Sequence, residues 1–362
     1  MGIAFPAGTT QTTPERYPTE RNDTMQIRRN LGLLALTFAT GLAPTTGCFL
    51  LGGYDGAYIE REDVSLDIYG GNATRSSGEK GEVYMLVAET AYDVNSWVAE
   101  VVEATSAVTR YLNNYPAQED QDGYRSYGPF DDEDGRDLAW IVKIKGDASA
   151  TSYKILVGDR GEGESDMLVL LDGHVEVDGD MRTGGFRLFF DAIEDQPELK
   201  DLEDSGTTFS GTIDVSFTRD VSTEEKTVDI QFNDFRAEYT LGDAWYSDET
   251  YAYHRDAAGN GEFHLAVYGT FDDQVFGGYQ TNKVVLDAKW DASEAGRARG
   301  QVLEVENEDS ALPAGDLVVH ECFDAAGDLT YRGLNDAYAG DHPEYLLGDP
   351  STCIYEASDL DG

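Results

Sequence analysis

Apolar residues follow a helical period over the segment from Glu82 to Asn114. They recur every three to four positions and form one broad stripe that includes Trp97 and Val101, which predicts a single amphipathic helix. Roughly 33 residues in a helix extend about 50 Å at 1.5 Å per residue, so we allow for a break near Thr90 or Asp93. Because the stripe is rich in valine, we expect it to pack on a sheet.

Beyond Asp137 the period of the apolar residues changes from 3.6 to 2. The segments around Ile213 and Leu265 show the clearest alternation of apolar and polar side chains. Alternation of this kind gives one buried and one wet face, which is typical of antiparallel sheet. We expect strands over Asp137–Lys145, Ser152–Val157, Met167–Val177, Gly185–Asp191, Thr207–Arg219, Lys226–Thr240, Glu262–Asp272, Lys283–Asp291, Gly300–Glu306 and Asp316–Phe323.

Glycine-rich and polar segments separate these elements. We expect one further strand over Val64–Tyr69, a polar acidic loop over Ala117–Asp137, and an irregular tail from residue 324 to residue 362. The sequences Asp256–Gly261 and Asp324–Asp328 are similar to each other and predict tight turns.

These elements predict an α+β fold, with one long helix packed on a large curved antiparallel sheet or half-barrel. A meander of roughly ten strands is too large to stay flat, so it should curl around the helix or close into a barrel. The expected outline resembles the half-barrel-plus-helix shape of lipoprotein carriers of the LolA-like group, an analogy of shape that no sequence motif supports.

The concave face of such a sheet would be apolar. Two outcomes are open: the face holds an apolar ligand, or the helix fills it through Val94, Trp97, Val98 and Val101. The expected lining residues are Phe209, Ile213, Phe217, Phe263, Val267 and Phe271.

The charge of the chain limits its partners. Asp and Glu number 70 against 26 Lys and Arg, which gives a net charge of −44. A phosphate-binding surface needs a basic patch, so we expect no nucleic-acid partner. An acidic surface with few lysines keeps a protein soluble in high salt and repels anionic lipid headgroups. The 40% of apolar residues still suffices for a sizeable core.

The segment from Gln26 to Cys48 has the order of an export signal. The positive Arg28 and Arg29 precede an apolar stretch over Leu31–Ala43, which small residues follow. The sequence Thr45-Thr46-Gly47-Cys48 resembles the lipobox of bacterial lipoproteins, although leucine is usual where Thr45 stands.

That resemblance implies a lipidated Cys48, carrying palmitate or a similar chain, as the first residue of the mature protein. It also implies a membrane partner reached through this anchor, and a place in the cell envelope at the outer membrane or periplasmic side. Two alternatives are an anchor helix over Leu31–Leu51 and simple secretion.

We therefore divide the chain into three parts. Residues 1–47 form a leader whose true start we place at Met25, residues 48–81 form a lipidated tether, and residues 82–362 form one β-rich domain that begins with the helix over 82–114. Of three cysteines, lipidation of Cys48 leaves Cys322 and Cys353, which we expect to form a disulfide in an oxidising compartment.

The chain carries no motif of a serine hydrolase, zinc protease, phosphate loop or dinucleotide site. We therefore expect no catalytic residues and no cofactor. The one candidate metal site is the acidic run of Asp131, Asp132, Asp134 and Asp137, whose carboxylates suit Ca²⁺ but whose spacing does not fit an EF-hand. A solvated acidic loop is the ordinary interpretation of such a run.

Taken together, these features predict a non-enzymatic envelope lipoprotein that serves as a structural or binding module. The alternatives are a secreted hydrolase with an unrecognised site and a Ca²⁺-dependent adhesion module.

Overall fold

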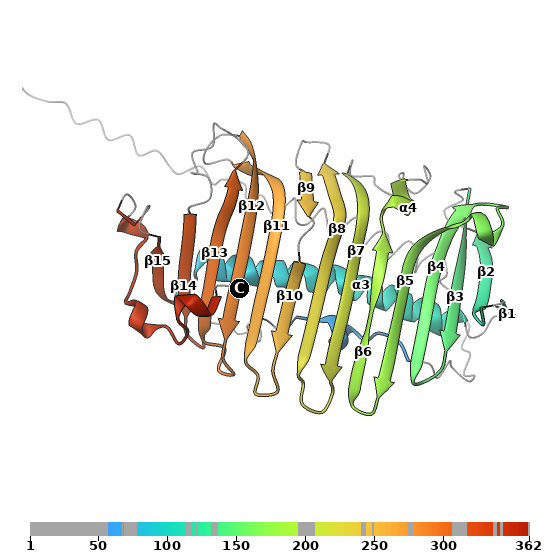
Figure 1. Ribbon diagram of the computed structural model, residues 1–362, viewed down its shortest axis with the longest axis horizontal. Coiled ribbons are helices and arrows are strands. Elements are labelled where there is room, and N and C mark those ends of the chain that lie inside the picture. Colours follow the sequence, from blue (N-terminus) through green and yellow to red (C-terminus); the bar gives the residue numbers. More distant parts are fainter. Residues whose placement is uncertain are drawn as a thin grey trace, which may run out of the picture.

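A single antiparallel sheet with a long helix lying across it makes up most of the molecule (Figure 1). The computed structural model describes residues 57–66, 68, 78–112, 117–120, 122–131, 137–194, 207–239, 244–247, 250–273, 278–305, 317–335, 339–340 and 343–360. The predictions for the leader, for Met25 and for Cys48 lie outside the described residues.

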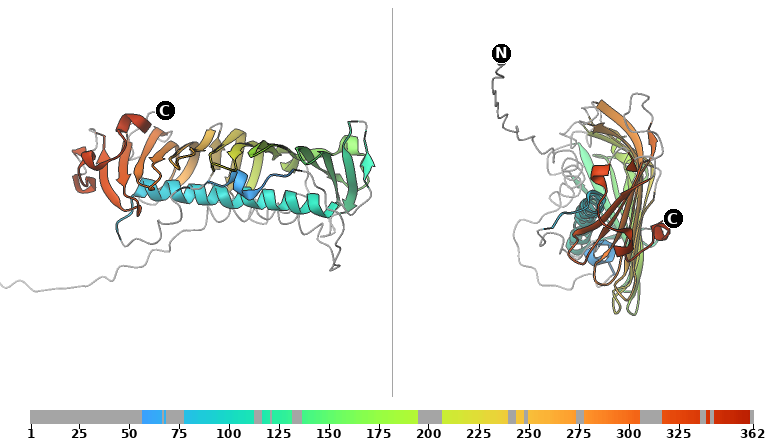
Figure 2. Two further views of the ribbon diagram at one scale, coloured as in Figure 1. Left: turned by 90° about the horizontal axis from the view of Figure 1, so that it is seen from below. Right: turned by 90° about the vertical axis from the view of Figure 1, so that its left-hand side faces the viewer.

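The strands pair antiparallel in nearly their order along the chain, with β9 and β10 both lying between β8 and β11. In the described part of the chain the sheet ends at β1 and β15 and is open, so closure into a barrel was a wrong alternative. Its two ends bend toward the side on which the long helix lies (Figure 2). The strands are β1 (Gln118–Glu119), β2 (Arg125–Asp131), β3 (Leu138–Gly146), β4 (Ala150–Asp159), β5 (Leu168–Asp178), β6 (Met181–Phe189), β7 (Thr207–Asp220), β8 (Lys226–Tyr239), β9 (Ala244–Ser247), β10 (Thr250–Arg255), β11 (Gly261–Asp273), β12 (Gly278–Trp290), β13 (Gly296–Val305), β14 (Leu317–Phe323) and β15 (Leu329–Leu334).

The long helix α3 (Glu82–Leu112) runs across the strands rather than along them (Figure 1). Its 31 residues span about 46 Å at 1.5 Å per residue. The nine steps from β14 to β4 cover roughly 43 Å at 4.8 Å per strand. Accordingly the helix starts beside β14, where the Glu321 carboxylate accepts hydrogen bonds from the first amides of α3. Near its other end the helix reaches Tyr153 of β4.

The helix continues without the break that we had allowed near Thr90 or Asp93. The hydroxyl of Thr90 donates to the carbonyl of Leu86 (2.8 Å), and that of Ser96 donates to the carbonyl of Tyr92 (3.0 Å). Polar side chains in the helix interior thus bond to the preceding turn and leave the backbone ladder intact.

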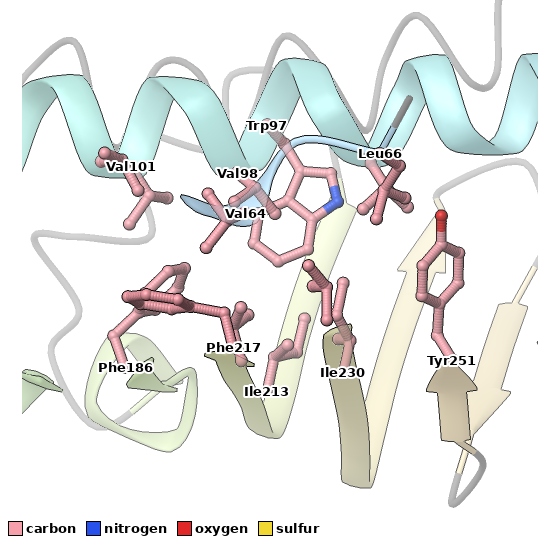
Figure 3. Close-up of a cluster of buried hydrophobic side chains, with 14 of the residues drawn as sticks. Val64, Leu66, Trp97, Val98, Val101, Phe186, Ile213, Phe217, Ile230 and Tyr251 are labelled. Carbon is pink, nitrogen blue, oxygen red and sulfur yellow. The ribbon is translucent and has the colours of Figure 1, made fainter. Parts of the chain in front are cut away.

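The apolar stripe of α3 packs on the sheet, as its valine-rich composition predicted. Trp97, Val98 and Val101 point at the side chains of Phe186 and Phe217 below them (Figure 3). These five side chains are all less than 9% exposed. Helix and sheet therefore share one core, and burying each large apolar side chain contributes about 1.5–3 kcal/mol.

The predicted strand over Val64–Tyr69 was wrong. The short helix α2 (Arg61–Val64) occupies its start, and Leu66 pairs with a helix side chain instead of a strand. The side chain of Asn95 accepts from the Leu66 amide (2.6 Å) and donates to the Leu66 carbonyl (2.8 Å). The alternation is real, but Asn95 supplies the hydrogen bonds that a neighbouring strand would have supplied.

The sheet extends into segments where sequence analysis predicted no strand. The expected loop over Ala117–Asp137 contains β1 and β2, and the expected irregular tail contains β15. Strand β10 was also missed. Glycine and proline interrupt the alternation in β2, where Gly128 has a positive φ of 111° and the register shifts, and bulges of this kind are typical of sheet edges.

The predicted turns at Asp256 and Asp324 are confirmed, and the same geometry recurs along this edge of the sheet. In each turn the first aspartate accepts a hydrogen bond from the amide two residues ahead, at 2.8–2.9 Å. Asp147, Asp220 and Asp291 repeat this contact in three other hairpins. The similarity of these sequences therefore reflects turn chemistry.

The predicted pair Cys322 and Cys353 lies at disulfide distance, with the sulfur atoms 2.02 Å apart. Cys322 belongs to β14, and its side chain points away from α3. The bond therefore ties the C-terminal segment to the face of the sheet opposite the helix, as Figure 2 shows for the turn η5 (Ala357–Leu360).

Candidate functional site

The face toward α3 offers little room for a ligand where it is described. Phe209, Ile213, Phe217 and Phe263 are 1–4% exposed and belong to the same core cluster as the helix. The side chains of Val267 and Phe271 lie outside the described residues. An apolar ligand on this stretch of the sheet would have to displace α3.

One polar cluster on this face fixes part of the segment that we expected to be a tether, residues 48–81. Asp63 of α2 is fully buried, and its carboxylate accepts hydrogen bonds from Arg182 at 2.8–3.1 Å. Arg219 lies 3.5 Å from the same carboxylate. Lys226 donates to the Glu62 carbonyl (3.1 Å). These basic residues are neighbours on β6, β7 and β8, so the sheet presents a short basic row to an acidic turn.

The opposite face of the sheet, here called the polar face, carries a row of chemically active side chains over β8 to β13. A small apolar cluster lies on the same face near the other end of the sheet, and it consists of Ala139, Ile141, Leu156 and Met167. The strand register places Asp229, Ala252, His264, Asp287 and Arg299 side by side on β8, β10, β11, β12 and β13. The alternation along each strand predicted polar residues on this face, but it did not predict this row, because residues on five strands become neighbours only through the register.

His264 and Asp287 form the best-defined pair in the row. The imidazole Nδ1 lies 2.7 Å from the Asp287 carboxylate, and the guanidinium of Arg299 lies 3.6 Å from it. Asp287 is 9% exposed on its side chain, whereas His264 is 43% exposed. A nearly buried carboxylate thus orients an accessible imidazole, an arrangement that can bind a ligand or assist proton transfer.

A second row follows beside the first. The hydroxyl of Thr227 lies 3.1 Å from Nδ1 of His254, and Lys289 pairs with Glu262 at 3.3 Å. The strand register makes Thr227, His254, Glu262 and Lys289 successive neighbours on four strands. The acidic Glu262 therefore has a basic partner within the face.

The C-terminal segment forms a wall beside these rows. Arg297 donates to the Tyr355 carbonyl (3.0 Å), and Arg299 donates to the Leu360 carbonyl (3.3 Å). With the Cys322–Cys353 bond, these contacts hold η5 on the polar face.

Between the two rows and η5 lies a pocket of about 530 Å³. The carboxylate of Asp229 faces it without a hydrogen bond or ion pair from any described residue, and partial burial raises the pKa of this carboxyl group. The lining residues are Thr227, Asp229, Ala252, Tyr253, His254, Glu262, Phe263, His264, Asp287, Ala288, Lys289, Asp359 and Leu360.

The structure describes only part of the candidate calcium site. Asp131 and Asp137 are exposed and lie 3.2 Å and 3.9 Å from the guanidinium of Arg160. Asp132 and Asp134 lie outside the described residues. Within the described ranges no three His, Cys, Asp or Glu side chains are grouped so that they could hold a metal ion.

Comparison with family models, curated proteins and solved structures gave no match for this chain. Of the helices in the described part, none is both long and apolar enough to cross a membrane.

Proposed function

We propose that this protein is a lipid-anchored, non-enzymatic module of the bacterial cell envelope, and that it binds its ligand on the polar face of the sheet. The lipobox-like sequence ending in Cys48 supports the anchor. The polar pocket beside η5 supports the binding role.

The fixed segment after Cys48 determines how close such an anchor would hold the domain to the membrane. Ala57 donates to the Asp147 carbonyl (3.1 Å), and Asp63 is locked by Arg182 and Arg219 a few residues later. Only nine residue steps separate Cys48 from Ala57, a reach of at most about 30 Å. A lipid on Cys48 would therefore hold the β3–β4 end of the sheet close to the membrane.

The binding role belongs to the polar face and not, as we expected from the sequence, to the apolar face. Because α3 covers the described apolar lining, a ligand there would compete with side chains such as Trp97. In the described part of the chain nothing covers the pocket on the polar face in this way, so a ligand can reach it with the core intact.

Metabolic labelling with a radioactive or clickable fatty acid tests the anchor. We expect the natural protein to take up the label and to fractionate with membranes, and Cys48→Ser to do neither. Cys353→Ser is the matched control and should keep the label. Natural protein that stays unlabelled, or whose processing ignores the signal-peptidase inhibitor globomycin, would refute the anchor.

A secreted hydrolase is the second candidate, and the His264–Asp287 pair favours it. An imidazole oriented by a carboxylate is the arrangement of a general base. A panel of chromogenic esters and glycosides tests this function. Turnover that His264→Asn abolishes and His174→Asn spares would support the hydrolase over the binding module.

A further inference from the structure

We infer that the polar pocket binds a small organic cation, an amine or guanidine whose charged group is held by Asp229. This inference deepens the proposed binding role of the polar face and does not depend on the lipid anchor. Three features of the pocket carry it: its charge, its shape and its wall.

The charge of the pocket is negative, and on the strands that line it one carboxylate is left without a basic partner among the described residues. Glu262 is paired with Lys289, and Asp287 is paired with His264 and Arg299. Asp229 has no such partner among the described residues. A carboxylate that is partly withdrawn from water and unpaired lowers stability, so its presence in a pocket favours a ligand that supplies the missing charge.

The shape of the pocket suits an elongated cation. Ala252 of β10 lies between Asp229 of β8 and His264 of β11, and its small side chain leaves a hollow between the side chains of these two residues. Two strand steps separate Asp229 from His264, about 9.6 Å, which leaves room for a short methylene chain. The pocket volume of about 530 Å³ falls within the range of small-molecule sites.

The wall of the pocket adds apolar and acidic contact on one side. Leu360 and Asp359 of η5 line it, and the Cys322–Cys353 bond ties this segment to β14. A ligand with an apolar chain and a cationic end would match both parts. A metal ion matches less well, because the carboxylates stand on separate strands and the described residues form no metal-binding group.

Isothermal titration of the full-length mature protein with agmatine and putrescine tests the inference. We expect saturable binding that 0.5 M NaCl weakens, and no heat from the uncharged 1-butanol. Asp229→Asn should weaken binding about tenfold or more, as for loss of a hydrogen bond to a charged group. Asp178 is exposed, lies outside the pocket and has no ion pair among the described residues, so Asp178→Asn should leave binding unchanged.

A second variant separates shape from charge. Ala252→Leu fills the hollow and keeps every charge, so we expect it to abolish binding. Thermal melting checks that both variants fold, and Asp229→Asn should melt no lower than the natural protein because it removes an unpaired carboxylate.

Three outcomes would overturn the inference. The first is that Asp229→Asn binds agmatine as tightly as the natural protein does, and the second is that 1-butanol binds as tightly as agmatine. The third is that Ca²⁺ binds in a way that needs Asp229 while agmatine does not bind. Fatty-acid labelling of the same variants keeps a failure here distinct from a failure of the anchor.

Discussion

Glu321 provides the sharpest test of how the helix and the sheet are joined. Its side chain is fully buried on β14, and its carboxylate accepts from the amides of Glu82 (2.9 Å) and Tyr84 (3.1 Å) in the first turn of α3. Arg332 of β15 donates to the same carboxylate (3.0 Å). A sheet residue therefore replaces the side-chain cap that Gly81, the residue before the helix, lacks.

Replacing Glu321 with alanine removes the acceptor of two amides and leaves the charge of Arg332 buried without this partner. Breaking a buried charge pair by deleting one member costs about 3–5 kcal/mol, so we expect the free energy of unfolding to fall by that amount. The matched control is Glu79→Gln. Its carboxylate lies 3.9 Å from Arg332 but is 66% exposed, so we expect a loss below about 1 kcal/mol.

Urea unfolding followed by circular dichroism measures both variants at pH 7. A double-mutant cycle with Arg332→Met isolates the pair, and we expect a coupling energy above about 1 kcal/mol. A loss for Glu321→Ala no larger than that for Glu79→Gln, or a coupling energy near zero, would refute the assignment of Glu321 as the cap of α3.

Other predictions follow from the core, the tail and the turns. Trp97→Ala should lower the free energy of unfolding by about 3–5 kcal/mol in the same urea assay. Reduction of the Cys322–Cys353 bond, which closes a loop over a separation of 31 residues, should cost about 3–4 kcal/mol, measured by melting with and without reductant. Hydrogen bonds from Ser222 and from Asn260 lower the pKa of Asp220 and of Asp256. The two ionised carboxylates therefore stabilise the fold fully above the pKa that they have in the unfolded chain, and this contribution is lost as the pH falls below about 4. In Asp220→Asn and Asp256→Asn the free energy of unfolding should depend less on pH in the acid range.

The sequence predicted the elements that carry a strong period of their own. The stripe around Trp97 repeats over eight turns, and the alternation around Ile213 covers a whole strand, so both were recognised within a few residues of their bounds. Both periods report burial on one face, which the structure confirms for each.

The strands at the two ends of the sheet were missed because buried and exposed residues alternate little along them. Strand β2 has one buried residue, Tyr127, and β15 has two neighbouring ones, Arg332 and Gly333. Edge strands pack against fewer neighbours, and their pattern weakens accordingly. The opposite error occurred at Val64–Tyr69, which alternates in sequence but is not a strand. Val64 and Leu66 belong to a segment outside the sheet, and both are buried in the core between the sheet and α3.

The pocket could not be predicted because pairing across strands creates it. Asp229, His264 and Asp287 each fall within a predicted strand, and they lie on the face opposite α3. Their proximity depends on the missed strand β10, which inserts Ala252 between Asp229 and His264. Asp131 and Asp137 could be proposed as a site from the sequence because they belong to one short acidic run.

The placement of the basic residues explains how so acidic a chain holds together. Only 26 Lys and Arg face 70 Asp and Glu, yet Arg182, Arg219 and Arg332 all lie where a fully buried carboxylate joins two parts of the fold. A buried carboxylate without a partner is costly, so scarce cations are most useful there. Asp229 departs from this arrangement, because no described cation reaches its carboxylate. The fully buried acids Asp63 and Glu321 each have a basic partner within the fold. Asp229 is partly buried in a pocket without such a partner, so a cationic ligand would supply the charge that the fold supplies elsewhere.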